Sequence, residues 1–302
     1  MVTPSERAET FEAHRAHLLA VAYRMTGTLA DAEDLVQEAF LRWVRVEDEV
    51  DEPRAYLTTM VTRLSIDHQR SARMRRERYV GPWLPEPVLG ERALAADAAT
   101  ELADDVSMAL LLALDRLSPL ERAAFILHEV FDVGYAELAA TLERSEAACR
   151  KLVERARASV RRSEPKRRTP KEEAERILGA FLFAVNSGDV EGLSQLLTED
   201  VVLYSDGGGK VSAALRPILG PSKVARFFVG VAKNHPLPPG HTVELAVVNG
   251  AYGVVIRLPD GVEQILSFEL TSDGRIARIY GVRNPDKLAR AAAAIGHPTP
   301  SP

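Results

Sequence analysis

Residues 31–43 read DAEDLVQEAFLRW. Val36, Phe40 and Trp43 recur at helical spacing, so this stretch predicts an amphipathic helix with one buried stripe. Its acidic residues suit the positive end of the helix dipole; they are Asp31, Glu33, Asp34 and Glu38. Surface helices with acidic first turns are common, so this helix alone does not indicate a function. The sequence that follows it does.

An arginine-rich segment follows. Between residues 63 and 78 the only acidic residues are Asp67 and Glu77, and the basic ones are Arg63, Arg70, Arg73, Arg75, Arg76 and Arg78. One small helical unit therefore presents an acidic face suited to docking a protein and a basic face suited to phosphates.

Composition limits the class of protein. The chain has 302 residues, enough for two or three domains, and its net charge of −5 excludes a uniformly basic protein that coats nucleic acid. Cys149 is the only cysteine, which excludes a disulfide framework and a cysteine-based metal cluster. Because no signal-like N-terminus and no apolar run of about 18 residues occur, we expect a soluble cytoplasmic protein without membrane contact.

A second helical block follows a proline-rich break. Ser118-Pro119-Leu120-Glu121 is a strong helix start, with a capping serine, a first-turn proline and a glutamate that closes a capping box. Residues 135–142 and 145–162 then form two helices joined by a short turn, and the second is rich in Arg and Lys. A generic helical hairpin is the alternative, but this basic charge favours a DNA-binding helix-turn-helix.

The third block changes from helices to strands. Asn249-Gly250, Asp260-Gly261 and Asp273-Gly274 are hairpin turn signals. They predict an antiparallel meander of Thr242–Val248, Gly253–Leu258, Val262–Leu270 and Arg275–Val282. Helices are expected over residues 171–186, 190–198 and 221–234, which makes this block an α+β domain with a curved sheet.

These signals predict six segments along the chain. Three prolines within Val80–Pro87 forbid a helix and favour an extended linker. The predicted segments are a first helical domain (1–78), a Pro-rich linker (79–96), a helix-turn-helix domain (97–164), a short linker (165–170), the α+β domain (171–295) and a tail (296–302).

The first two blocks resemble the ECF sigma factors, small initiation subunits of bacterial RNA polymerase. The resemblance rests on Asp31–Glu38, on the stretch from Arg54-Ala55-Tyr56-Leu57 to Arg76, and on Leu117–Arg122 leading into the helix-turn-helix. The third block resembles the SnoaL-like branch of the nuclear-transport-factor-2-like fold, which one ECF subgroup carries as a fused extension. The fold implied is multidomain: two all-α sigma domains, the second with a helix-turn-helix, then an α+β SnoaL-like cone with a curved antiparallel sheet.

The resemblance implies the partners and their sites. Core RNA polymerase, through its β′ coiled coil, would bind Asp31, Asp34, Leu35, Gln37 and Glu38. Promoter DNA at the −10 element would meet Arg63, Asp67, Arg70, Arg73, Arg75 and Arg76, although many relatives carry asparagine at Arg63, so recognition of a flipped base does not transfer to it. At the −35 element the contacting residues would be Ser145, Glu146, Arg150, Lys151, Arg155 and Arg157.

The resemblance also implies a regulatory interface for the third domain. The residues come from motifs that look like signatures of the subgroup: Trp83, Leu84, Pro85, Glu86 and Pro87; Asp206, Gly207, Gly208, Gly209 and Lys210; Asn284, Pro285, Asp286, Lys287 and Leu288. Three consecutive glycines indicate a turn or the close approach of another backbone. A flexible hairpin tip is the alternative for the glycines.

Other functions are open for the third domain. Its fold hosts enzymes elsewhere, and the catalytic candidates would be Tyr204, Asp206, His241, Tyr252 and Glu269, but no spacing singles out an acid–base pair. A small apolar ligand bound as a signal is a further possibility. No cofactor and no metal are expected, since only His14 and His17 among the histidines are closely spaced.

Two readings of the whole chain compete with a sigma factor. One is a helix-turn-helix regulator with a small-ligand-binding domain, and the other is a SnoaL-like enzyme fused to a DNA-binding module. The acidic helix favours the sigma factor, because a repressor does not need it and a polymerase subunit does.

Overall fold

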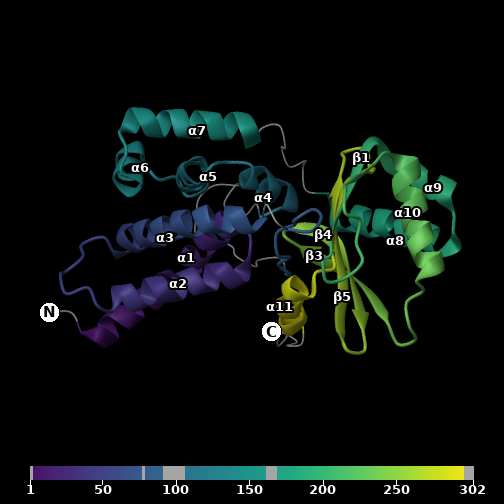
Figure 1. Ribbon diagram of the computed structural model, residues 1–302, viewed down its shortest axis with the longest axis horizontal. Helices are drawn as coiled ribbons and strands as arrows, with labels where there is room; N and C mark the ends of the chain where they lie inside the picture. Colours follow the sequence, from purple (N-terminus) through teal and green to yellow (C-terminus); the bar gives the residue numbers. More distant parts are fainter. Residues whose placement is uncertain (1–2, 77–78, 91–105, 161–168, 296–302) are drawn as a thin grey trace. The chain divides into compact units, whose positions relative to one another are not determined.

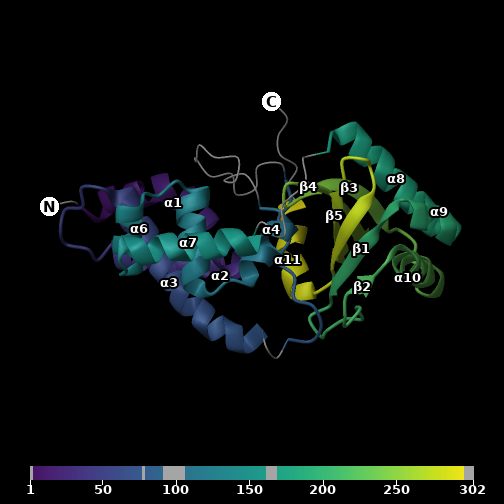
Figure 2. The same cartoon turned by 90° about the horizontal axis from the view of Figure 1, so that it is seen from above.

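The computed structural model describes residues 3–76, 79–90, 106–160 and 169–295, and these divide into two compact units (Figures 1 and 2). Unit 1 consists of Met1–Arg78 and Leu94–Glu164, and unit 2 of Tyr79–Ala93 and Pro165–Pro302. The two helical blocks thus share one unit, and the first part of the linker folds with the C-terminal unit. Within the described ranges, no helix combines the length and apolarity needed to cross a membrane.

Unit 1 begins with three helices that pack on one another: α1 (Pro4–Thr26), α2 (Leu29–Trp43) and α3 (Pro53–Arg76) (Figure 1). α1 starts in a capping box between Thr3 and Glu6, and it ends at Gly27, whose left-handed φ of 77° is a common helix stop. Trp43 is buried and its indole N–H donates to the Arg7 carbonyl at 2.8 Å. Val36 is buried as well and Phe40 is half-buried, so the stripe of α2 packs against the neighbouring helices.

The second half of unit 1 contains α4 (Met108–Asp115), α5 (Pro119–Phe125), a π-helical turn η1 (Ile126–Val130), α6 (Tyr135–Leu142) and α7 (Glu146–Val160). The predicted capping box of Ser118 and Glu121 is present at the start of α5. The turn between α6 and α7 passes through Glu143, which adopts φ of 54°. α6 and α7 are the expected helix-turn-helix pair.

Arginines join the two halves of unit 1. Arg122 of α5 donates from Nε to the Arg24 carbonyl near the end of α1 at 2.8 Å. Conversely, Arg63 of α3 donates to the Ala140 and Thr141 carbonyls at the end of α6, at 3.0 and 3.1 Å. Each half thus supplies a cation to carbonyls in the last turn of a helix in the other half. These contacts add to the packing of α1 and α3 against α4, α5, η1 and α6, which joins the two blocks in one unit.

Unit 2 is built on a six-stranded sheet of order β2-β1-β6-β5-β4-β3. The strands are β1 (Leu197–Asp206), β2 (Ile218–Leu219), β3 (Thr242–Val248), β4 (Ala251–Leu258), β5 (Gly261–Leu270) and β6 (Ile276–Val282). The predicted meander β3–β6 is confirmed, and its first turn has positive φ at both Asn249 and Gly250. The sheet is mixed, however, because β1 runs parallel to β6.

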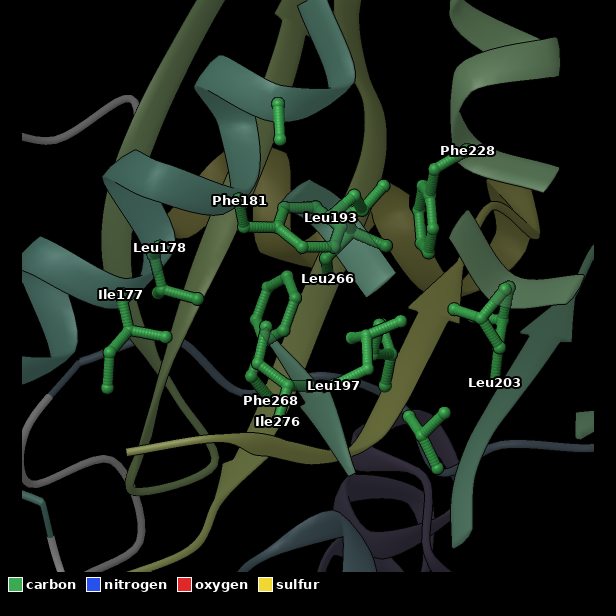
Figure 3. Packing of buried hydrophobic residues seen from close by; sticks show 14 of the residues in the cluster. Ile177, Leu178, Phe181, Leu193, Leu197, Leu203, Phe228, Leu266, Phe268 and Ile276 are labelled. Atoms are coloured by element: carbon green, nitrogen blue, oxygen red, sulfur yellow. The ribbon is translucent and has the colours of Figure 1, made fainter. Parts of the chain in front are cut away.

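Helices cover both faces of this sheet. α8 (Lys171–Ser187), α9 (Val190–Gln195) and α10 (Pro221–Asn234) lie on one face, and α11 (Pro285–Ile295) lies on the other (Figure 2). The core is on the first face, where the Phe181 ring makes edge contacts with Phe228 and Phe268 at centroid distances of 5.0 and 5.2 Å (Figure 3). We call this the inner face and the α11 side the outer face.

Candidate functional site

α2 presents an acidic edge to solvent. Asp34, Gln37 and Glu38 are exposed, and Glu38 pairs with Arg42 at 2.8 Å on the same helix. Asp31 is half-buried, accepting a hydrogen bond from the Thr28 hydroxyl at 2.6 Å. Leu35 is buried, so in this conformation it packs α2 against its neighbours. The exposed part of the predicted docking set is therefore Asp34, Gln37 and Glu38.

The predicted −10 residues of α3 differ in their surroundings. Arg70 and Asp67 form an exposed pair at 3.0 Å. Arg63 instead lies against the end of α6, and its Nη1 is 3.2 Å from the Glu143 carboxylate. Arg73, Arg75 and Arg76 belong to α3, but their side chains fall outside what the structure describes.

The predicted −35 residues follow α7. Ser145 caps the helix by accepting from the Ala148 N–H at 3.3 Å, while Glu146, Arg150, Lys151 and Arg155 are exposed along the first turns. Arg157 is half-buried and donates to Glu129 of η1 at 2.5 Å, a bond that raises the pKa of its guanidinium. Most of the predicted set therefore shares one exposed helix surface.

The three motifs of the predicted regulatory interface meet on the outer face of unit 2. The buried Asp206 carboxylate lies at their centre. It accepts hydrogen bonds from the Tyr79 hydroxyl at 2.6 Å, the Leu84 N–H at 2.9 Å and the Gly208 N–H at 3.0 Å. We call the set that surrounds this carboxylate the linker clamp; it consists of Tyr79, Trp83, Leu84, Asp206, Asn284 and Lys287.

Lys287 supplies the balancing charge of the linker clamp. Its buried Nζ lies 2.7 Å from Asp206 Oδ2 and also donates to the Leu84 carbonyl. The ammonium lies 4.4 Å from the Trp83 ring centroid, so a cation–π contact adds to the ion pair. Loss of one partner of such a buried pair typically costs about 3–5 kcal/mol. Both members of the Asp206–Lys287 pair therefore help to hold the linker.

Tyr79 links the remaining members of the clamp. The Asn284 amide donates to the Tyr79 hydroxyl at 2.8 Å, and that hydroxyl donates onward to Asp206. Burial and the Asp206 carboxylate raise the pKa of Tyr79, so the hydroxyl keeps its proton. Farther along the linker, the Val88 N–H donates to Asn249 Oδ1 at 3.0 Å, and Leu89 bridges to Val248 of β3. The linker is therefore tied to the sheet at two places.

The glycines of the second motif allow this close packing. A Cβ on Gly208 would lie 2.5 Å from Asn284 Cγ, and the residue has φ of +64°. A Cβ on Gly207 would lie 2.3 Å from the Val211 carbonyl oxygen. Two further charged residues of the motifs, Lys210 and Asp286, form an exposed pair at 2.6 Å. Pro85, Glu86, Pro87 and Leu288 are buried beside the clamp, and Pro285 is exposed.

The carboxylates considered for catalysis face away from the core. Side chains alternate along a strand, and Leu203, Phe268 and Ile279 belong to the inner-face core. Asp206 and Glu269 are therefore on the outer face; Glu269 pairs with Arg278 at 2.7 Å and accepts from the Tyr280 hydroxyl. His241 is exposed, and in the described ranges no cluster of three metal-ligating side chains occurs.

Residues 10–75 match the family Sigma-70 region 2, and residues 107–160 match Sigma-70, region 4. Over 287 residues the chain is 41% identical to the ECF RNA polymerase sigma factor SigJ of Mycobacterium tuberculosis. The aligned region covers 92% of this chain and 92% of SigJ. The chain belongs to the ECF sigma factor family. Another M. tuberculosis relative, the ECF sigma factor SigG, is 32% identical over 228 residues, covering 65% of this sigma factor and 61% of SigG.

The resemblance to SigJ includes the fold. The crystal structure of the M. tuberculosis extracytoplasmic function sigma factor SigJ matches this sigma factor with a TM-score of 0.71 at 38% identity. The match covers 93% of this chain and 98% of that one, so it extends over helical domains and C-terminal α+β domain alike.

Sequence reasoning missed several residues that the structure uses in this sigma factor. Tyr79 stands between an arginine-rich helix and a proline-rich linker, in no pattern that marks it as a ligand of Asp206. Arg122 and Arg24 carry no positional signal for the contact between the two halves of unit 1.

Proposed function

We propose that this sigma factor binds the β′ coiled coil of core RNA polymerase through the exposed edge of α2. Asp34 and Glu38 are four residues apart and therefore share one side of the helix. Leu41, exposed one turn farther, offers an apolar contact beside them. Acidic groups with an adjacent amide suit a basic, hydrogen-bonding partner.

Promoter DNA is the second partner in this proposal. Arg70, with Arg73, Arg75 and Arg76, would contact the −10 region, and Arg150, Lys151 and Arg155 of α7 would enter or flank the −35 major groove. Contacts with phosphates supply affinity and contacts with base edges supply specificity. Binding of this kind weakens steeply as salt rises.

The C-terminal unit would modulate initiation in cis through the linker clamp. The observation that carries this role is the buried Asp206–Lys287 pair, to which Tyr79, Trp83 and Leu84 of the linker attach. The linker joins α3 to α4. Because part of the linker is attached to unit 2, fewer residues are free to connect the −10 and −35 domains. We assign unit 2 a regulatory role rather than a catalytic one, and transcription by clamp variants tests it.

Charge reversal tests the polymerase surface. The double variant Asp34→Lys/Glu38→Lys should lower capture by purified core polymerase about tenfold or more, because like charges then meet across the contact. Glu12→Lys is the matched control, since Glu12 is exposed on α1 and pairs only with neighbouring Arg15 among the described residues. Equal capture of the wild type and the double variant, at unchanged helicity, contradicts the assignment.

A further inference from the structure

The guanidinium of Arg150 is held by two neighbours on the exposed surface of α7. Its Cζ lies 4.3 Å from the Tyr135 ring centroid, and Nη2 donates to the Glu146 carboxylate at 3.1 Å. More than half of the Arg150 side chain is exposed. Among the described residues, Glu146 is the one hydrogen-bond acceptor of Arg150. The N–H groups on Nε and Nη1 can therefore donate to another partner.

The Tyr135 ring packs in turn against a second ring, that of His128. It is the first residue of α6, and its ring lies 4.2 Å from the His128 imidazole, centroid to centroid. His128 stands in the π-helical turn η1 and its Nδ1 is hydrogen-bonded to the Val133 carbonyl at 2.8 Å. Irregular π turns of this kind often occur at functional sites. α6 thus carries an aromatic platform, the Tyr135 ring, which His128 supports and against which Arg150 of α7 lies.

We propose that Tyr135 is a positioning residue for sequence reading at the −35 element. By holding the guanidinium of Arg150 against its ring, it directs the remaining N–H donors outward, where they reach the O6 and N7 acceptors of a guanine in the major groove. A free arginine side chain would have to be ordered on binding, and the platform reduces that cost. This inference rests on the proposed function of α7.

Base preference during transcription tests the role of Tyr135. Core polymerase is combined with each full-length sigma variant on promoters randomised across the −35 element. Arg150→Ala should reduce the preference for a base at its contact position about tenfold. Tyr135→Leu should reduce the same preference about two- to fivefold, as expected for an exposed cation–π pair, whereas Tyr135→Phe should retain it.

A double variant separates positioning from simple support of the fold. In the Arg150→Ala background, Tyr135→Leu should cause no further loss of preference at that position. The inference is overturned if Tyr135→Leu keeps the wild-type preference, if it weakens preference at all −35 positions alike, or if Arg150→Ala changes no base preference. A wild-type protein that selects no −35 sequence would instead refute the proposed function, and this inference with it.

Discussion

His17 of α1 shows how burial sets the charge state of a single side chain. Its Nε2 lies 3.1 Å from the Thr58 hydroxyl, and Arg54 Nη2 lies 3.3 Å from Nδ1. Burial, followed by the charge of Arg54, lowers the pKa of His17 from 6.5 to about 4. The folded imidazole therefore stays neutral at a pH where an exposed histidine takes up a proton.

A pH dependence of stability follows from that lowered pKa. Between pH 6.5 and about 4 the unfolded chain binds a proton at His17 that the folded chain does not, so the free energy of unfolding falls as pH drops through this window. We predict that His17→Gln removes this pH-dependent loss of stability, which is at most about 3–4 kcal/mol. Denaturant unfolding followed by circular dichroism, at pH values above and inside the window, measures the effect.

The control for this experiment is His241→Gln, because His241 is exposed in unit 2. That variant should keep the wild-type pH dependence. A His17→Gln variant whose stability still falls as steeply as that of the wild type would show that other groups produce the dependence.

At the scale of elements, the end of α6 is capped from a distant helix. Arg63 of α3 donates to the Ala140 and Thr141 carbonyls, and the Thr59 and Thr141 hydroxyls lie 2.9 Å apart. A cation at a helix C-terminus is favourable because it interacts with the unpaired carbonyls. Arg63 therefore stabilises the C-terminal end of α6, the first helix of the helix-turn-helix.

Loss of this cap should loosen α6. We predict that Arg63→Ala lowers the local opening free energy of α6 by about 1–2 kcal/mol, because charge-assisted hydrogen bonds to its last turn are lost. Amide hydrogen exchange across α6 and α7 measures the change. Arg70→Ala is the control, since Arg70 pairs with Asp67 on the same helix at an exposed position. Unchanged exchange in Arg63→Ala would refute the capping role.

The elements differ in how far sequence reasoning could predict them. Helices with strong caps were predictable, because the Ser118 capping box and the Gly27 stop act through neighbouring residues. β3–β6 were predictable from their turns. β1 was not predicted, since no turn signal separates it from α9, and its parallel pairing with β6 joins residues distant in the chain. The π-helical form of η1 carries no comparable signal.

At the scale of the whole molecule, the linker is the element whose role depends most on distant residues. The sequence predicts its extended form from its prolines, and the resemblance to one ECF subgroup points to the three motifs. The contacts could not be derived from spacing, because Tyr79 and Asn284 of the same clamp are separated by more than half of the chain. Neither could the grouping of the two helical blocks in one unit, to which Arg63 and Arg122 contribute contacts between the blocks.

Transcription with purified core polymerase tests the central claim, that unit 2 acts on initiation through the linker clamp. Asp206→Asn removes the buried charge paired with Lys287. Tyr79→Phe is a milder change, because it removes the two clamp hydrogen bonds of the Tyr79 hydroxyl but no charge. Asp273→Asn is the matched control, because Asp273 lies outside the three motifs and forms an exposed pair with Arg275 whose loss costs little.

All variants are compared at equal occupancy of the polymerase on one set of promoters. We predict that Asp206→Asn, and to a smaller extent Tyr79→Phe, change promoter-dependent transcription, while Asp273→Asn matches the wild type. Identical transcription from the wild type and both clamp variants would contradict the claim.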